Sequence, residues 1–98
     1  MKTDILIIGS GCSGLYCALQ LPADKQITII TKADLESSDS FLAQGGMCML
    51  KSDSDYDSYF EDTMKAGHYE NDKKSVDIMI RSSQDVVKDL LSYGVDFK

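Results

Sequence analysis

The first third of the chain passes from one hydrophobic pattern to another and back. Residues 4–8, DILII, form a continuous apolar run after one acid, which is typical of a strand covered on both faces in a parallel sheet. From Cys12 to Leu21 the apolar positions recur at helical spacing, and Pro22 ends that pattern. Residues 27–31, ITIIT, read as a second strand. The order strand, helix, strand predicts a βαβ unit with parallel strands.

Two further helices are predicted in the second half of the chain. One starts at Tyr56 and ends near Gly67, which we expect to adopt the left-handed cap conformation. The other has an apolar face from Val76 to Leu91, and it ends at Gly94. Its start has three candidate caps: Asn71, Asp72 and Ser75. Residues 95–97, VDF, look like the opening of another strand or bend.

Length, charge and cysteine content exclude several classes of protein. The 98 residues are enough for one domain at most, and their composition, 43% hydrophobic and 27% charged, is that of a folded chain. A net charge of −6 makes nucleic acid and anionic membrane surfaces unfavourable partners. The sequence shows neither a membrane span nor a signal peptide, so we predict a cytoplasmic protein. The three cysteines lack CxxC spacing, which predicts reduced thiols and no metal site.

A glycine motif follows the first predicted strand and opens the first predicted helix. Gly9, Gly11 and Gly14 in GSGCSG have the GxGxxG spacing. In a dinucleotide site the first glycine permits a tight turn, the second allows close approach to a pyrophosphate, and the third allows the helix to pack on the strand. The alternative is a glycine-rich turn without a ligand, but the flanking strands and helix favour dinucleotide binding. The motif's other residues would contribute mainly backbone: Ser10, Cys12 and Ser13.

The identity of the dinucleotide is left open by the glycine motif. Many such folds have an acidic residue at the end of the second strand, where it binds the adenosine ribose. Here that place is taken by Thr31 and Lys32. A lysine there can face a 2′-phosphate, which favours NADP, or it can simply be a solvated strand end.

Three segments together carry a resemblance to a known family. They are DILIIGSGCSGLYCALQL, then SDSFLAQGG, then YFEDTMKAGHYENDKKSVDIMIRSSQDVVKDLLSYGVDF. Over its whole length the chain resembles the flavoprotein family of succinate dehydrogenases, fumarate reductases and L-aspartate oxidases, and it is most similar to the L-aspartate oxidase branch. The resemblance implies a Rossmann-like α/β fold that binds FAD, with residues 1–98 as the N-terminal part of the FAD-binding domain. The capping and C-terminal domains would lie outside this chain.

The resemblance also implies which residues contact FAD. The glycine loop would hold the pyrophosphate, Lys32 would lie beside the adenosine ribose, and residues 39–46, DSFLAQGG, would run beside the flavin ring. Glycines suit that loop because a flat ring needs close backbone approach and N–H donors. The candidate contacts are Gly9, Ser10, Gly11, Cys12, Ser13, Gly14, Lys32, Asp39, Ser40, Phe41, Leu42, Ala43, Gln44, Gly45 and Gly46.

Asp39 departs from one part of the family's pattern. Succinate dehydrogenases and membrane-linked fumarate reductases carry a histidine that bonds covalently to FAD, in a motif similar to SHT..AQGG. Aligned on AQGG, that position is Asp39 in this chain. Aspartate cannot form the histidyl linkage, so the resemblance implies non-covalent FAD, as in L-aspartate oxidases and soluble fumarate reductases.

The activity implied by the resemblance is the oxidation of L-aspartate to iminoaspartate, the first step of de novo NAD synthesis. Electrons would pass from FAD to oxygen or fumarate, and the imine would be handed to quinolinate synthase. The substrate-binding arginines and histidines of the family have no matching motif here, so we assign no catalytic residue. Two alternatives stay open: a fragment of a soluble fumarate reductase or succinate dehydrogenase flavoprotein, and a non-catalytic nucleotide-binding module.

Overall fold

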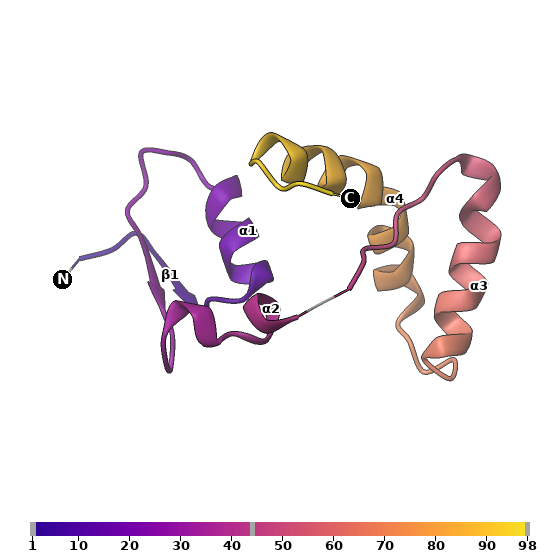
Figure 1. Cartoon of the computed structure of the whole chain (residues 1–98), viewed down its shortest axis with the longest axis horizontal. Coiled ribbons are helices and arrows are strands. Elements are labelled where there is room, and N and C mark those ends of the chain that lie inside the picture. The colour runs from indigo at the N-terminus through magenta and orange to yellow at the C-terminus, as the bar shows by residue number, and fades with distance from the viewer. Residues whose placement is uncertain (1, 44, 98) are drawn as a thin grey trace. The chain divides into compact units, whose positions relative to one another are not determined.

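A computed structural model describes residues 2–43 and 45–97 of the chain. The chain divides into two compact units, Met1–Gly45 and Gly46–Lys98, and each is described here by itself (Figure 1). The first unit contains the strands and the glycine loop. The second is helical. Within the described residues, none of the helices combines the length and the apolar character that crossing a membrane requires.

The first unit is the βαβ unit that the hydrophobic pattern predicts. Strand β1 spans Ile5–Ile8, helix α1 spans Cys12–Gln20 and strand β2 spans Ile27–Ile30. The strands pair in parallel, with Ile5 beside Ile27 and Ile8 beside Ile30. Parallel strands require a crossover, which α1 supplies between them. The predicted α/β class with parallel strands is therefore confirmed.

One face of this two-stranded sheet is exposed. Along β1, Ile5 and Ile7 are half-buried, whereas Leu6 is 52% and Ile8 80% exposed. Ile30 of β2 is 45% exposed. Within the described chain a single crossover helix covers only one face of the sheet, so the prediction that the first strand is covered on both faces stays a prediction for the complete domain.

The segment after β2 contains more helix than the sequence suggests. A 3-10 helix spans Leu35–Ser37, and the four-residue helix α2 spans Asp39–Leu42. The Ser38 hydroxyl caps α2 by accepting the Phe41 N–H at 3.1 Å. The first half of the predicted flavin-contacting loop is therefore a short capped helix, and an extended conformation returns at Ala43.

The second unit is built on two helices that share a small core. A 3-10 helix at Asp53–Asp55 leads into α3, Tyr56–Ala66, and α4 spans Lys73–Ser92 (Figure 1). The core consists of Leu50, Met64, Val76 and Ile80, with Tyr56, Tyr59 and Phe60 packed against it. Both predicted helices are confirmed.

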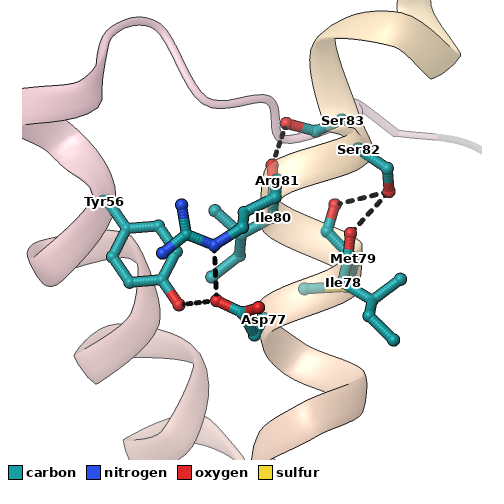
Figure 2. Close-up of polar contacts among 8 residues, drawn as sticks. All are labelled: Tyr56, Asp77, Ile78, Met79, Ile80, Arg81, Ser82 and Ser83. Atoms are coloured by element: carbon teal, nitrogen blue, oxygen red, sulfur yellow. Dashed lines mark hydrogen bonds and ion pairs between the residues drawn. The ribbon is translucent and has the colours of Figure 1, made fainter.

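Two polar bonds attach the segment before α3 to α4. The backbone N–H of Leu50 donates to the buried Ser83 hydroxyl at 2.9 Å, and the Gln84 side-chain amide donates to the Leu50 carbonyl at 2.7 Å. The Ser83 hydroxyl also donates to the Ile80 carbonyl of its own helix at 2.7 Å (Figure 2). Leu50 thereby has both of its backbone polar groups satisfied inside the core, as burial requires.

A polar cluster connects α3 and α4 at their surface. Figure 2 shows the Tyr56 hydroxyl donating to the Asp77 carboxylate, and the Arg81 Nε donates to the same oxygen at 2.8 Å. The Arg81 guanidinium also lies 4.4 Å from the centroid of the Tyr56 ring. These donors lower the pKa of Asp77 from its ordinary value, the Tyr56 hydrogen bond most of all and the Arg81 hydrogen bond next. The bond to Asp77 raises the pKa of Tyr56.

Both ends of α4 agree with the sequence. Asp72, one of the three candidate caps, accepts the Ser75 N–H at 2.8 Å and starts α4. Gly94 has φ 94°, and the Val95 N–H returns to the Leu90 carbonyl at 3.0 Å, which is a glycine-terminated helix end. Residues 95–97 beyond it form neither the strand nor the bend that their sequence suggests.

The left-handed cap predicted at Gly67 is wrong. Gly67 has φ −88°, and the next two residues, His68 and Tyr69, have φ 56° and 59° instead. The Asn71 side chain occupies the space beside residue 67: a Cβ there would lie 2.1 Å from its Oδ1, so a larger residue would require this side chain to move. The Asn71 amide donates to the Thr63 carbonyl at 3.1 Å, so this side chain occupies the end of α3.

Candidate functional site

The glycine loop begins where β1 ends, and the backbone there requires glycine. Gly9 has φ 116°, which L-residues with a side chain rarely adopt. Its N–H donates to the Ile30 carbonyl at 2.8 Å, so the loop starts as a continuation of the parallel pairing. A Cβ on Gly14 would lie 2.5 Å from the Gly9 carbonyl oxygen and 3.1 Å from Cγ2 of Ile7. Gly14 thus permits α1 to pack directly on the loop and strand, which is the role predicted for the third glycine.

The N-terminus of α1 directly follows the glycine loop. The first N–H groups of any helix lack an intrahelical acceptor, and the peptide dipoles place a partial positive charge there. Gly11, the N-cap residue, has no side chain with which to cap them. The Cys12 N–H donates to the Ser40 hydroxyl at 2.9 Å, which ties the glycine loop to α2. Gly11 leaves room for this bond, because a Cβ there would lie 3.3 Å from Oγ of Ser40.

A cavity of about 580 Å³ lies beside this loop. It is bounded by the carboxyl ends of both strands and by the segment that leads into α2. Its lining residues are Ile8, Gly9, Ser10, Gly11, Ile30, Thr31, Lys32, Ala33, Ser37, Ser38, Asp39 and Ser40. The cavity is therefore lined by the backbone of the glycine loop, by hydroxyls, by one ammonium group and by one carboxylate. Apart from the carboxylate, these groups suit a phosphate ester of a nucleoside.

The structure gathers only part of the predicted site. Of the candidate residues, Gly9, Ser10, Gly11, Lys32, Asp39 and Ser40 line the cavity, and Cys12 is bonded to Ser40. Ser13 and Gly14 lie in the first turn of α1. Phe41, Leu42, Ala43 and Gly45 belong to the same unit but are not among its lining residues.

Two further candidates, Gln44 and Gly46, are not among the lining residues. Gly46 begins the second unit, whose placement relative to the first is not defined. Gln44 lies outside the described residues.

Several lining residues were missed from the sequence. Thr31 stands directly before Lys32 at the end of β2, so its position in the chain was a signal for it. Ala33, Ser37 and Ser38 lie in a polar loop with no motif of its own. Nothing in the sequence pattern separates these loop residues from ordinary surface.

Comparison with known proteins decides the family. The FAD binding domain family matches residues 4–98. The chain belongs to this family. FAD is therefore the cofactor class of the fold, and the prediction of FAD over NADP, made from the two glycine segments together, is confirmed. No solved structure matches the chain.

Several relatives of this FAD-binding chain are L-aspartate oxidases. An L-aspartate oxidase of Clostridium perfringens is 40% identical over 95 residues, which are 97% of this chain and 22% of the relative. The L-aspartate oxidase of Clostridium acetobutylicum is 38% identical over 97 residues, 99% of this chain and 22% of the relative. The chloroplastic L-aspartate oxidase of Oryza sativa subsp. japonica is 36% identical over 95 residues, 96% of this chain and 15% of the relative. The predicted resemblance to this branch is confirmed, and the chain spans about a fifth of the length of the first two relatives.

Proposed function

We propose that the chain is the N-terminal part of the FAD-binding domain of an L-aspartate oxidase, whose capping and C-terminal domains lie outside these 98 residues. Two findings support this proposal. The family match extends over residues 4–98, and relatives of that name align with nearly all of the chain while being several times longer. A cytoplasmic location, expected from the sequence, belongs to the same proposal.

The observation that carries the proposal is the cavity at the carboxyl ends of β1 and β2. The crevice outside these strand ends is where open parallel sheets bind their ligands. There the FAD pyrophosphate would be held by the backbone of Gly9 to Ser13 and by the first turn of α1. Lys32 would bring its ammonium group to the adenosine end of the same cavity.

The segment from Asp39 to Gly46 would lie beside the flavin ring. Phe41 and Leu42 are 60% and 65% exposed, so they offer apolar surface that a flat ring can cover. Gly45 has φ 142° and nothing within 4 Å of an added Cβ, which leaves its backbone open to close approach. This part of the site rests on the sequence resemblance and on this local backbone.

We propose that FAD is bound non-covalently. Asp39, at the position of the histidine that forms the covalent link in part of the family, lines the cavity with a carboxylate that has no such chemistry. Acid precipitation of the complete natural protein should leave all of the yellow flavin in the supernatant. Flavin that stays attached to the denatured chain would contradict the role given to Asp39.

When bound, FAD would supply the hydride acceptor for oxidation of L-aspartate at its α-carbon, and the product would be iminoaspartate. Oxygen or fumarate would then take up the electrons. The residues of this chain bind and orient the cofactor, and we assign none of them to the chemical step. The product imine hydrolyses readily in water, so an enzyme that uses it has to take it up quickly. We propose quinolinate synthase as that enzyme.

Anaerobic addition of L-aspartate tests the reaction. We expect L-aspartate to bleach the flavin absorbance of the complete natural protein, and fumarate or oxygen to restore it. Bleaching by succinate but not by L-aspartate would replace the proposal with a succinate dehydrogenase or fumarate reductase activity. A protein that binds FAD and responds to neither compound would be the non-catalytic module.

A further inference from the structure

A second cavity, of about 470 Å³, lies within the second unit. Its larger side chains come from the segment after the glycine pair, from α3 and from α4: Met47, Cys48, Tyr59, Met79 and Val86. None of the described residues that line it is charged, although charged residues make up 27% of the chain. Depletion of charge is typical of the central part of a protein interface.

The smaller lining residues carry hydroxyls that are already used inside the unit. Thr63, Ser82 and Ser83 each donate to a carbonyl of their own helix, at 2.8, 2.6 and 2.7 Å, and Figure 2 shows the bonds of the two serines. A hydroxyl has one hydrogen to donate, so these three offer no further donor to an occupant. The Tyr59 hydroxyl differs, because it has no hydrogen-bond partner within the described residues. A fitting occupant is therefore apolar and carries one hydrogen-bond acceptor.

The apolar side chains at this cavity are held in place but left uncovered. Met47 and Met79 are 48% and 47% exposed. Leu50, three residues after Met47, is buried in the core and bonded through its backbone to Ser83 and Gln84 of α4. The segment is therefore fixed on the helix beside the cavity, and its exposed methionine does not belong to a loose loop. Covering this apolar surface would stabilise the protein.

The length of the relatives indicates what covers the cavity. Residues 1–98 correspond to 22% of each of two L-aspartate oxidases, so most of such a protein lies outside them. We propose that an apolar segment of the complete protein, from outside residues 1–98, packs into this cavity against Met47, Met79 and Val86. A backbone carbonyl of that segment accepts the Tyr59 hydroxyl. This inference rests on the proposed function, because it assumes the larger oxidase.

Photo-crosslinking of the complete natural protein tests the proposal. The photoreactive amino acid p-benzoylphenylalanine replaces Met79 or Val86 inside the cavity. Lys88 is the matched control, because it is exposed on the same helix and lies about 200° around the axis from Val86. After irradiation, a denaturing gel separates crosslinks within one chain from crosslinks between two copies, and mass spectrometry identifies the crosslinked peptides.

The positions of Met79 and Val86 should crosslink within one chain to a peptide from outside residues 1–98, and the position of Lys88 should not reach that peptide. Cys48 gives a second readout, since it lines the cavity and is exposed in the described chain. In the folded complete protein it should react with iodoacetamide at least about a hundredfold more slowly than after unfolding, because a covered thiol reacts only when the structure opens. Met79→Asp should raise that rate at least about tenfold, since a carboxylate is poorly tolerated in an apolar contact, whereas Met79→Leu should leave it unchanged.

Three results would overturn the inference. Crosslinked protein at twice the mass of the chain would make the cavity part of an interface between two copies. Crosslinks to residues 1–45 alone would make the first unit the occupant. Cys48 that reacts as fast in the folded protein as in the unfolded one would leave the cavity open to solvent or to a small molecule. A complete protein that fails to bind FAD would instead overturn the proposed function.

Discussion

Gly14→Ala is the substitution that tests the packing of α1 on the glycine loop. The added Cβ would lie 2.5 Å from the Gly9 carbonyl oxygen and 3.1 Å from Cγ2 of Ile7. The first of these neighbours is backbone, so it cannot rotate away as the end of a flexible side chain can. Either α1 moves outward from β1, or the loop that begins at Gly9 moves.

The expected energies follow from two opposing effects. Forcing one extra carbon into a packed contact costs about 1–3 kcal/mol, and replacing glycine by alanine in a helix recovers about 1 kcal/mol. The net destabilisation should therefore be up to about 2 kcal/mol. Because the same displacement moves the backbone donors of the cavity, FAD affinity should fall by about tenfold, which corresponds to about 1.4 kcal/mol.

The assay is urea unfolding of the complete apo-protein, followed by titration with FAD. Gly46→Ala is the matched control for stability, because a Cβ at Gly46 meets nothing within 4 Å and its φ lies outside the left-handed region. That control should unfold at the wild-type urea concentration or slightly above it. A Gly14→Ala protein that matches wild type in both unfolding midpoint and FAD affinity would refute the packing argument.

Three further predictions concern other parts of the chain. Ser83→Ala should lower the free energy of unfolding by about 1–3 kcal/mol in urea titrations, since it removes the acceptor of the buried Leu50 N–H; an unchanged midpoint would contradict that bond. The pKa of Asp77 is lowered in the folded state from 3.8, so its stabilising effect is complete above that pH and is lost as the pH falls through the lower folded value. Acid unfolding should therefore be shallower in Asp77→Asn below about pH 4, and equal slopes would contradict the contribution of this carboxylate. Cys12, beside the loop, and Cys17 are both exposed. FAD should slow the alkylation of Cys12 but not of Cys17, which is measured by mass spectrometry of labelled peptides. Equal protection of both would contradict the placement of FAD.

The periodic segments were the predictable part of the fold. The β-branched runs, the helical spacing after Gly11 and the apolar face of the last helix each reflect one dominant local pattern, and the structure has each element within a residue or two, except that the last helix begins a few residues earlier. The cap of α4 was narrowed to three residues by the sequence, Asn71, Asp72 and Ser75, and the structure has Asp72. Local chemistry was enough in these cases.

Other features of the fold do not follow from the local hydrophobic pattern. Gly67 reads as a left-handed cap, but its φ is −88° and the Asn71 side chain lies beside it. The apolar run of β1 reads as doubly covered, yet one face stays exposed in the described chain. In the site, the bond from Cys12 to Ser40 joins residues 28 apart, and no periodicity indicates such a contact.

The short helix α2 was a different kind of miss. Its start was readable in principle, because Ser38 is a good cap residue three before Phe41. The glycine pair that follows favours a loop. Four residues are also too few to show a helical period. In the structure the helix is tied to the glycine loop by the bond from the Cys12 N–H to the Ser40 hydroxyl.

The central claim is that the cavity binds the adenosine diphosphate half of FAD. Equilibrium titration of the complete natural apo-protein with FAD, NADP and FMN tests this claim most directly. The account predicts one FAD bound per chain, FMN bound much more weakly because it lacks the adenosine and one phosphate, and no competition from NADP at equal concentration. NADP that binds more tightly than FAD, or FMN that binds as tightly as FAD, would contradict it.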